Sequence, residues 1–426
     1  MPDGTASAHL YRPKLATVLR EGYGLEVFRK DVLAALTVTI VALPLSMAIA
    51  VASGISPDRG LYTAIVGGFV VSALGGSRFQ IGGPAGAFIV LVAATVAKSG
   101  IEGLLLTVMM SGVMLTLVGL SRLGSLIRYI PHAVTVGFTG GIAITIFASQ
   151  LKDFCGLRLA GAEPGPLISK LTALAEALPT VSTAALLIGA GTAGIIFTVA
   201  RSRPGWPAML IAVAAASAAA AMLHLPVETI GSRFGGIPNG LPMPRLPSIT
   251  PSSIRQALPA ALSFTLLGGI ESLLSAKVAD GMTGRRHRSN MELVAQGIAN
   301  VASALFGGFS VTGTIARTAT NIRAGARTPF SGMMHAVFLL LFMLVAAPLA
   351  SFVPLPALAG VLIVVCWNMA EKAEFLRLLR QPHTAAVLLA TFGFTLVKDL
   401  TSGILAGCLI AAALAAFGRA APPEGD

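Results

Sequence analysis

Long apolar runs dominate the pattern of hydrophobic and polar positions along the chain. Many of them are about 20 residues long, which is the length a helix needs to cross about 30 Å of hydrocarbon. Strands of a membrane barrel would instead alternate apolar and polar residues over about ten positions. The pattern therefore predicts an all-α polytopic membrane protein and excludes a β-barrel.

The apolar runs predict fourteen transmembrane segments. Their expected ranges are 32–52, 60–75, 82–97, 103–120, 130–149, 183–200, 206–223, 257–276, 291–306, 312–322, 331–350, 354–369, 383–398 and 400–417. Two of them, 82–97 and 312–322, are short and begin with glycine, and each is third in its set of seven. Since seven is odd, we expect the second set to be inverted relative to the first. Short broken segments at matching places in inverted halves point to a transport site.

These segments divide the chain into five expected parts. They are a cytoplasmic arm (1–30), a first inverted repeat (31–223), an extracellular loop (224–256), a second inverted repeat (257–418) and a short tail (419–426). Lys and Arg are about twice as frequent in the parts expected inside as in those expected outside, which places both termini in the cytoplasm. The first apolar run lacks a small-residue cleavage site, so no signal peptide is expected. We therefore expect a multi-pass protein of the inner (plasma) membrane.

The composition agrees with this prediction and narrows the function classes. Hydrophobic residues make up 55% of the chain and charged residues 11%, against about 25% charged in soluble proteins. The net charge of +12 is explained by basic cytoplasmic loops, so the expected partner is the lipid bilayer and not nucleic acid. The three cysteines have no metal-ligand spacing. We expect no cofactor, no metal site and no enzymatic activity.

Two glycine-rich stretches, 82–88 and 307–317, interrupt the apolar pattern. A helix N-terminus carries unpaired N–H groups and about half a positive charge, so two of them facing one cavity would bind an anion. The alternative is that these glycines only permit close helix packing. The residues predicted to surround the anion are Pro44, Leu45, Ser46, Gly83, Pro84, Ala85, Gly86, Thr314, Ile315, Ala316 and Arg317.

Two ionisable residues lie within predicted spans. A charge at that depth costs from about 2.5 to more than about 10 kcal/mol, so Arg317 is expected to face protein, water or ligand. We predict that Arg317 attracts the anion; a structural ion pair with Glu271 is the alternative. Burial opposes the charged form of Glu271 and a nearby guanidinium favours it, so this carboxyl is predicted to exchange a coupling proton. The alternative for Glu271 is a fixed counter-ion, and Ser275 is a candidate accessory residue.

Several of these stretches together resemble the SulP family of anion transporters, which includes prestin. The resemblance is carried by 35–48 with Gly54 and 60–62, 75–78, 83–84, 271–274, 279–284 and 313–321. It implies a seven-plus-seven inverted repeat, with a core domain of spans 1–4 and 8–11 and a gate domain of spans 5–7 and 12–14. It also implies a small anionic substrate between spans 3 and 10, an elevator-like movement of the core, and a homodimer.

The chain departs from the common family pattern at the expected site. Leu45 follows Pro44 where many sulfate-type members have Gln, and Ala85 and Ala316 are small. Pro-Leu and Ile-Ala-Arg resemble bacterial members that carry C4-dicarboxylates, so we predict proton-coupled uptake of fumarate or succinate. A sulfate or bicarbonate carrier, with sodium as coupling ion, and an anion channel stay open as alternatives. The STAS domain that family members usually carry at the C-terminus is not expected here.

Overall fold

The computed structural model describes residues 11–124, 131–161, 163–164, 166–203, 206–398 and 400–416. The first ten residues of the expected arm and the expected tail 419–426 lie outside these ranges. In the described part, seven helices are long and apolar enough to cross a membrane, and three shorter apolar helices accompany them. Many large apolar side chains on these helices are exposed, including Leu187, Val345 and Leu409, as lipid-facing side chains are.

Almost all of the described chain is helical. The elements of the first half are α2 (Lys14–Glu21), α3 (Leu25–Ala52), α4 (Pro57–Tyr62), the π-helix η1 (Thr63–Gly67), α5 (Gly68–Leu74), the strand β1 (Gly82–Gly83), the 3-10 turn η2 (Gly86–Phe88), α6 (Ile89–Leu120), α7 (His132–Cys155), α8 (Leu167–Glu176), the 3-10 turn η4 (Leu178–Thr180), α9 (Thr183–Ser202) and α10 (Ala208–Met222). Those of the second half are α11 (Ile230–Phe234), α12 (Pro251–Thr283), α13 (Ser289–Leu305), the strand β2 (Thr312–Gly313), α14 (Ile315–Arg323), α15 (Phe330–Ala350), α16 (Leu355–Met369), α17 (Lys372–Leu379), α18 (Pro382–Val397) and α19 (Leu400–Ala416).

Each of the fourteen ranges expected from the sequence overlaps a helix. The expected segments 82–97 and 103–120 both fall on η2 and α6, which are divided at Gly100 (φ 67°, ψ −171°). Glycine adopts this positive φ without steric cost, and the chain turns there. The crossing of a membrane by fourteen segments and the inversion of the two halves stay predictions.

Two helix starts and three short elements differ from the expectation. The expected loop 224–256 contains α11, and α12 begins at Pro251 rather than at 257, because the Thr250 side chain caps its first turn in a reciprocal capping box with Ser253. The helix α3 begins at Leu25, inside the expected arm. The all-α expectation also missed β1 and β2, because the two stretches pair through their backbones as extended chain.

The described part of the arm is attached to the loop that leads into β1 and to the loop that follows α12. The backbone N–H of Lys14 donates to Gly75 O at 2.9 Å, and its Nζ donates to Arg286 O at 2.8 Å. Arg78 of the loop donates to Glu21 of α2, and this hydrogen bond lowers the pKa of the Glu21 carboxyl. These contacts hold α2 against the segment that precedes the strand.

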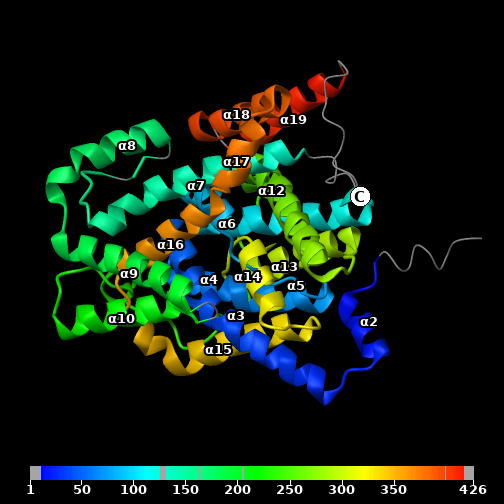
Figure 1. The fold of residues 1–426 in the computed structure, drawn as a ribbon, viewed down its shortest axis with the longest axis horizontal. Helices are drawn as coiled ribbons and strands as arrows, with labels where there is room; N and C mark the ends of the chain where they lie inside the picture. The colour runs from blue at the N-terminus through cyan, green and yellow to red at the C-terminus, as the bar shows by residue number, and fades with distance from the viewer. Residues whose placement is uncertain are drawn as a thin grey trace, which may run out of the picture.

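The contacts between helices divide them into two packing groups. In the first group α6 packs on α12 and α13, α15 packs on α3 and α5, and α14 packs on α3 and α12. In the second group α7 packs on α16 and α18, α9 packs on α10 and α16, and α19 packs on α18. Figure 1 shows α13 and α14 near the middle of the molecule, with α9 and α10 at one side and α18 and α19 at another. The groups meet where α3 contacts α10 and α16, and where α7 contacts α3, α6 and η2.

Candidate functional site

The two glycine-rich stretches meet in the first group of helices. The strands β1 and β2 pair antiparallel, with Gly82 opposite Gly313 and Gly83 opposite Thr312. The segment formed by η2 and α6 begins at Gly86, just after β1, and α14 begins just after β2. Both short segments are therefore broken at their starts. The two helix starts follow the paired strands β1 and β2, and we call this strand pair the strand crossing.

Neither helix start at the crossing has a side-chain cap. The N-cap positions are Ala85 for η2 and Thr314 for α14, and no side-chain hydrogen bond satisfies the first N–H groups of either helix. By contrast, α9, α11 and α12 are capped by Ser or Thr side chains. The free N–H groups carry the positive end of each helix dipole. Gly86 is half-buried and Ala316 is exposed, so both helix starts have accessible residues.

Polar side chains from neighbouring helices support the extended backbone before β2. Asn300 of α13 donates to Val311 O at 2.9 Å and accepts from Val311 N at 3.0 Å. Ser303 donates to Phe309 O at 2.7 Å, and Thr63 of η1 accepts from Phe309 N at 2.8 Å. Non-helical backbone at membrane depth needs such partners, because no water is available to replace them.

The strands and α14 are joined by a second set of hydroxyl contacts. Ser272 Oγ of α12 lies 2.8 Å from Thr312 Oγ1. Thr318 Oγ1 of α14 accepts from Ile81 N at 3.1 Å and from Ser275 Oγ at 3.3 Å. Ser275, expected as an accessory site residue, therefore contacts α14 from behind and helps to fix its position.

Replacing Asn300 with leucine is expected to destabilise the fold by roughly 2–6 kcal/mol, because both backbone groups of Val311 would be buried without partners at about 1–3 kcal/mol each. Thermal unfolding of the purified protein in detergent measures this as a lower Tm. Asn239→Leu, at an exposed loop position, is the matched control and is expected to leave the Tm unchanged. An unchanged Tm for Asn300→Leu would show that the segment before β2 does not depend on α13.

Arg317 lies beneath the crossing and is 1% exposed. Its Nη2 donates to Ser46 Oγ at 3.2 Å and to Pro84 O at 3.1 Å. A Cβ built on Gly83 would overlap its Nη1, so the guanidinium lies directly against that glycine. The structure thus gathers Ser46, Gly83 and Pro84 around one buried positive charge. Its Nε and Nη1 have no hydrogen-bond partner among the described residues.

Glu271 of α12 is half-buried, and its Oε2 is inaccessible and unpaired among the described groups. The described ion pairs do not include one between Glu271 and Arg317, so the alternative of a direct structural pair is not realised in this structure. Opposite charges on the two groups would attract each other without a direct contact. The guanidinium and the carboxyl therefore belong to one electrostatic environment without being in contact.

The remaining expected residues lie around this centre in different ways. Pro44 and Leu45 are buried within α3, next to Ser46. Ala85 and Thr314 are also buried, whereas Ile315 is 38% exposed at the start of α14. The structure therefore brings the glycine stretches, Ser46 and Arg317 together. Pro44 and Leu45 occupy buried positions of the neighbouring helix α3.

The sequence analysis did not identify the buried polar residues of α13 that bind the segments before β1 and β2. Glu292 of α13 is fully buried, and its Oε2 accepts from the N–H groups of Gly76 and Ser77 in the loop before β1, at 2.8 and 3.0 Å. Glu292 and Asn300 belong to a buried polar stripe at helical spacing inside an expected span. Its members are Glu292, Gln296, Asn300 and Ser303. That spacing is the signal that could have identified them.

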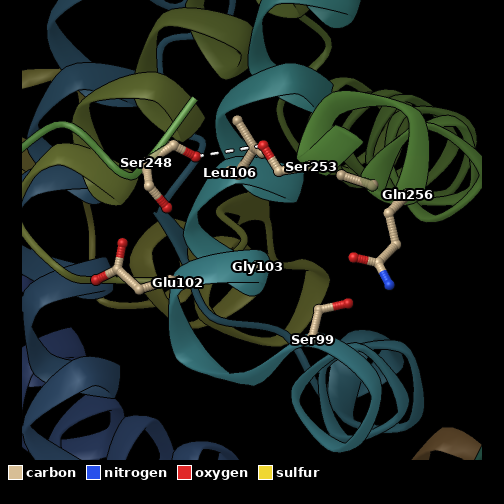
Figure 2. Close-up of a pocket in the computed structure, with 8 residues that line it drawn as sticks. Ser99, Glu102, Gly103, Leu106, Ser248, Ser253 and Gln256 are labelled. Atoms are coloured by element: carbon tan, nitrogen blue, oxygen red, sulfur yellow. Dashed lines mark hydrogen bonds between the residues drawn. The ribbon is translucent and has the colours of Figure 1, made fainter. Parts of the chain in front are cut away.

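A separate polar pocket of about 140 Å³ lies at the break in α6 and the start of α12. Its lining residues are Ser99, Glu102, Gly103, Leu106, Ser248, Ser253, Gln256 and Ala257 (Figure 2). Ser253 donates to Ser248 O at 3.4 Å and belongs to the capping box of α12. The pocket shares no lining residue with the strand crossing, and the Glu102 carboxylate would repel an anion. We therefore interpret this pocket as a gap between the break in α6 and the start of α12, and not as part of the anion site.

Comparison with protein families gives one match to most of the chain. A model described as the sulfate permease family matches residues 28–391. The putative sulfate transporter YvdB of Bacillus subtilis (strain 168) is 44% identical over 394 residues, which cover 92% of this chain and 74% of that protein. The bicarbonate transporter BicA of Picosynechococcus sp. is 31% identical over 398 residues, covering 90% of this chain and 69% of BicA.

Solved structures share the fold. The transmembrane domain of a cyanobacterial bicarbonate transporter BicA superposes with a TM-score of 0.81 at 32% identity, covering 89% of this chain and 98% of that domain. The structure of SLC26A9 superposes with a TM-score of 0.88 at 18% identity, covering 97% of this chain and 69% of that protein. The second likeness concerns the fold alone.

Proposed function

Since the chain belongs to the sulfate permease family, we propose that it is a secondary transporter that binds a small anion at the starts of α6 and α14 and carries it across the membrane. The observation that carries this proposal is the crossing of β1 and β2. It places two uncapped helix N-termini above the buried charge of Arg317.

The electrostatics of the crossing favour a negative ligand. Each helix start contributes about half a positive charge, and Arg317 contributes a full one without an ion-pair partner among the described residues. An anion at the free N–H groups would supply the missing counter-charge and accept hydrogen bonds from the backbone. Arg317 would then act through its field, because its guanidinium is held beneath the strands by Ser46 and Pro84.

We propose that Glu271 couples transport to protons. Burial opposes the charged form of the Glu271 carboxyl, and the guanidinium of Arg317 partly offsets this effect when the site is empty. A bound anion would neutralise part of the guanidinium charge and so favour uptake of a proton by the carboxyl. Anion and proton would then bind together, which is the linkage that a symporter needs.

The two packing groups suggest how the site could move. We propose that α3–α6 and α12–α15 form the core domain and that α7, α9, α10, α16, α18 and α19 form the gate domain. The contacts of α3 with α10 and α16 would then be the sliding interface of an elevator-like movement. Fourteen spans in two inverted repeats, cytoplasmic termini and a homodimer complete the proposal.

We propose a C4-dicarboxylate such as fumarate or succinate as the substrate, because Ala85 and Ala316 give the two helix starts small and apolar side chains. Sulfate and bicarbonate are second candidates, because the relatives named above are described as transporters of these anions.

Uptake into proteoliposomes tests the proposal. We expect labelled fumarate to accumulate, faster with an inward proton gradient than without one, and unlabelled succinate to compete better than sulfate, bicarbonate or chloride. An uptake rate that is the same with and without the proton gradient would contradict proton coupling. Sulfate or bicarbonate as the strongest competitor would overturn the choice of substrate, and currents far above carrier turnover would indicate a channel.

Gly83→Ala is expected to weaken anion binding by about tenfold, which corresponds to about 1.4 kcal/mol. The new methyl group would occupy the place of Arg317 Nη1, and this flexible end can move without disrupting the backbone. Binding of labelled anion to the purified protein measures the effect. Gly191→Ala in α9 is the control, because nothing lies within 4 Å of a Cβ there. Equal affinities in the two variants would contradict the role of the guanidinium position.

A further inference from the structure

The described part of the N-terminal arm contacts the ends of three helices. Tyr11 Oη donates to Leu120 O, at the end of α6, at 2.8 Å. Arg288, which follows α12, donates through Nη1 to Arg12 O at 2.7 Å and to Thr17 Oγ1 at 3.1 Å. The arm also binds the loop after α5 through the backbone contact described above. It therefore joins the ends of α5, α6 and α12 in one surface next to the start of α3.

Basic side chains outnumber carboxylates in this surface. Three described carboxylates lie near it, and each already has a partner. Glu21 accepts from Arg78, and Glu292 accepts from backbone N–H groups of the loop after α5. Asp280 Oδ2 lies 2.6 Å from Nδ1 of His287. The positive groups, which we call the basic cluster, are Arg12, Lys14, Arg78, Arg285, Arg286 and Arg288.

The positive charges of the cluster lie close enough to repel one another. The pKa of the Lys14 ammonium is lowered by its partial burial and then by the charges of Arg288 and Arg78, and Asp280 offsets only part of this effect. The pKa of the Arg288 guanidinium is also lowered, by burial and then by the charges of Arg12 and Arg78. The structure therefore holds these groups together against their mutual repulsion.

Helix ends can compensate only part of the cluster. A helix C-terminus carries about half a negative charge, and Lys14 and Arg288 donate to backbone oxygens near such ends. The side chains of Arg285 and Arg286 are exposed, and they make no hydrogen bond or ion pair with the residues that the structure describes. These two charges are left for a ligand from outside the chain.

Exposed apolar side chains lie on the neighbouring part of the arm and on the first turn of α3. Leu19 of α2 is 57% exposed, Leu25 is 66% exposed and Phe28 is 39% exposed. Figure 1 shows α2 at the edge of the molecule, beside the start of α3, which is long and apolar enough to cross a membrane. A free phosphate ion would use the basic cluster alone, whereas a phospholipid would use both its basic and its apolar neighbours.

We infer that the basic cluster is a binding site for the headgroup phosphate of an anionic phospholipid, with the acyl chains beside Leu19 and Leu25. Arg285 and Arg286 supply the unpaired charges that the phosphate neutralises. The site shares no residue with the strand crossing, so the inference goes beyond the proposed function and does not depend on it.

Binding of fluorescently labelled phosphatidylglycerol to the purified protein in detergent tests the inference. We expect unlabelled phosphatidylglycerol to displace the label at a concentration at least about tenfold lower than phosphatidylcholine with the same acyl chains. The double variant Arg285→Gln/Arg286→Gln is expected to bind phosphatidylglycerol about tenfold more weakly and to keep the wild-type Tm in the absence of lipid, because neither side chain has a partner. Arg201→Gln/Arg380→Gln removes two exposed charges elsewhere, and it is expected to bind like the wild type.

Three results would overturn the inference. The first is equal affinity of the wild type for the two lipids. The second is unchanged binding of phosphatidylglycerol in the double variant, or in Arg286→Gln alone if the double variant does not fold. The third is full displacement of the label by inorganic phosphate at the concentration at which phosphatidylglycerol displaces it, which would indicate a site for the free ion. Anion uptake enters none of these measurements, so failure of the proposed function leaves the test intact.

Discussion

Replacing Arg317 with methionine is expected to weaken anion binding by about 100-fold while the protein stays folded. A unit charge about 6 Å from a bound anion contributes about 2.8 kcal/mol at an effective dielectric constant of about 20, which corresponds to about two orders of magnitude in affinity. Methionine fills the space beside Gly83 without the charge. Binding of labelled fumarate and thermal unfolding should be measured on the same preparation.

The stability of the same variant separates a binding role from a structural one. Arg317 is buried, and its Nε and Nη1 have no partner among the described residues. The relief of the desolvation cost of this charge offsets the loss of the hydrogen bonds to Ser46 and Pro84 O, so we expect the Tm to change little. Arg323→Met, at the exposed end of α14, is the matched control and should change neither quantity. Loss of both binding and Tm in Arg317→Met would show that the guanidinium holds the fold.

Replacing Glu271 with glutamine is expected to abolish the acceleration of uptake by an inward proton gradient. Glutamine keeps the shape of the side chain but cannot exchange a proton. Uptake driven by the anion gradient alone should continue, because the helix starts and Arg317 are unchanged. Proteoliposome uptake with and without the proton gradient measures both effects.

Glu176→Gln, at an exposed position of α8, is the control and should respond to the gradient like the wild type. Glu271→Gln protein that is still accelerated by the gradient would place the coupling proton on another group. Failure of the same variant to bind any anion would show instead that Glu271 is needed to form the site.

The helices could be predicted from the sequence because each apolar run carries its own length and hydropathy. The start of α12 was predicted too late, although Thr250 and Pro251 give a local capping signal, because the apolar run itself begins later in the chain. The break in α6 at Gly100 agrees with the expected separation of 82–97 from 103–120. Local patterns of this kind decide where helices begin and end.

The interior of the site could be predicted only in part. The glycines and Arg317 stand out because they interrupt apolar runs, whereas the pairing of Gly82 with Gly313 joins backbones far apart in the chain. The two hydrogen bonds between Asn300 and the Val311 backbone could not be predicted, because the sequence does not show which segment packs on the polar stripe of α13. The sequence also left open a direct pair between Arg317 and Glu271, which depends on helix positions that no local pattern specifies.

A density map of the protein saturated with its strongest competing anion tests the central claim most directly. We expect ligand density within hydrogen-bonding distance of the first N–H groups of η2 and α14, next to the strand crossing and close to Arg317. Density at another place in the molecule, with the two helix starts empty while the anion is bound, would contradict it.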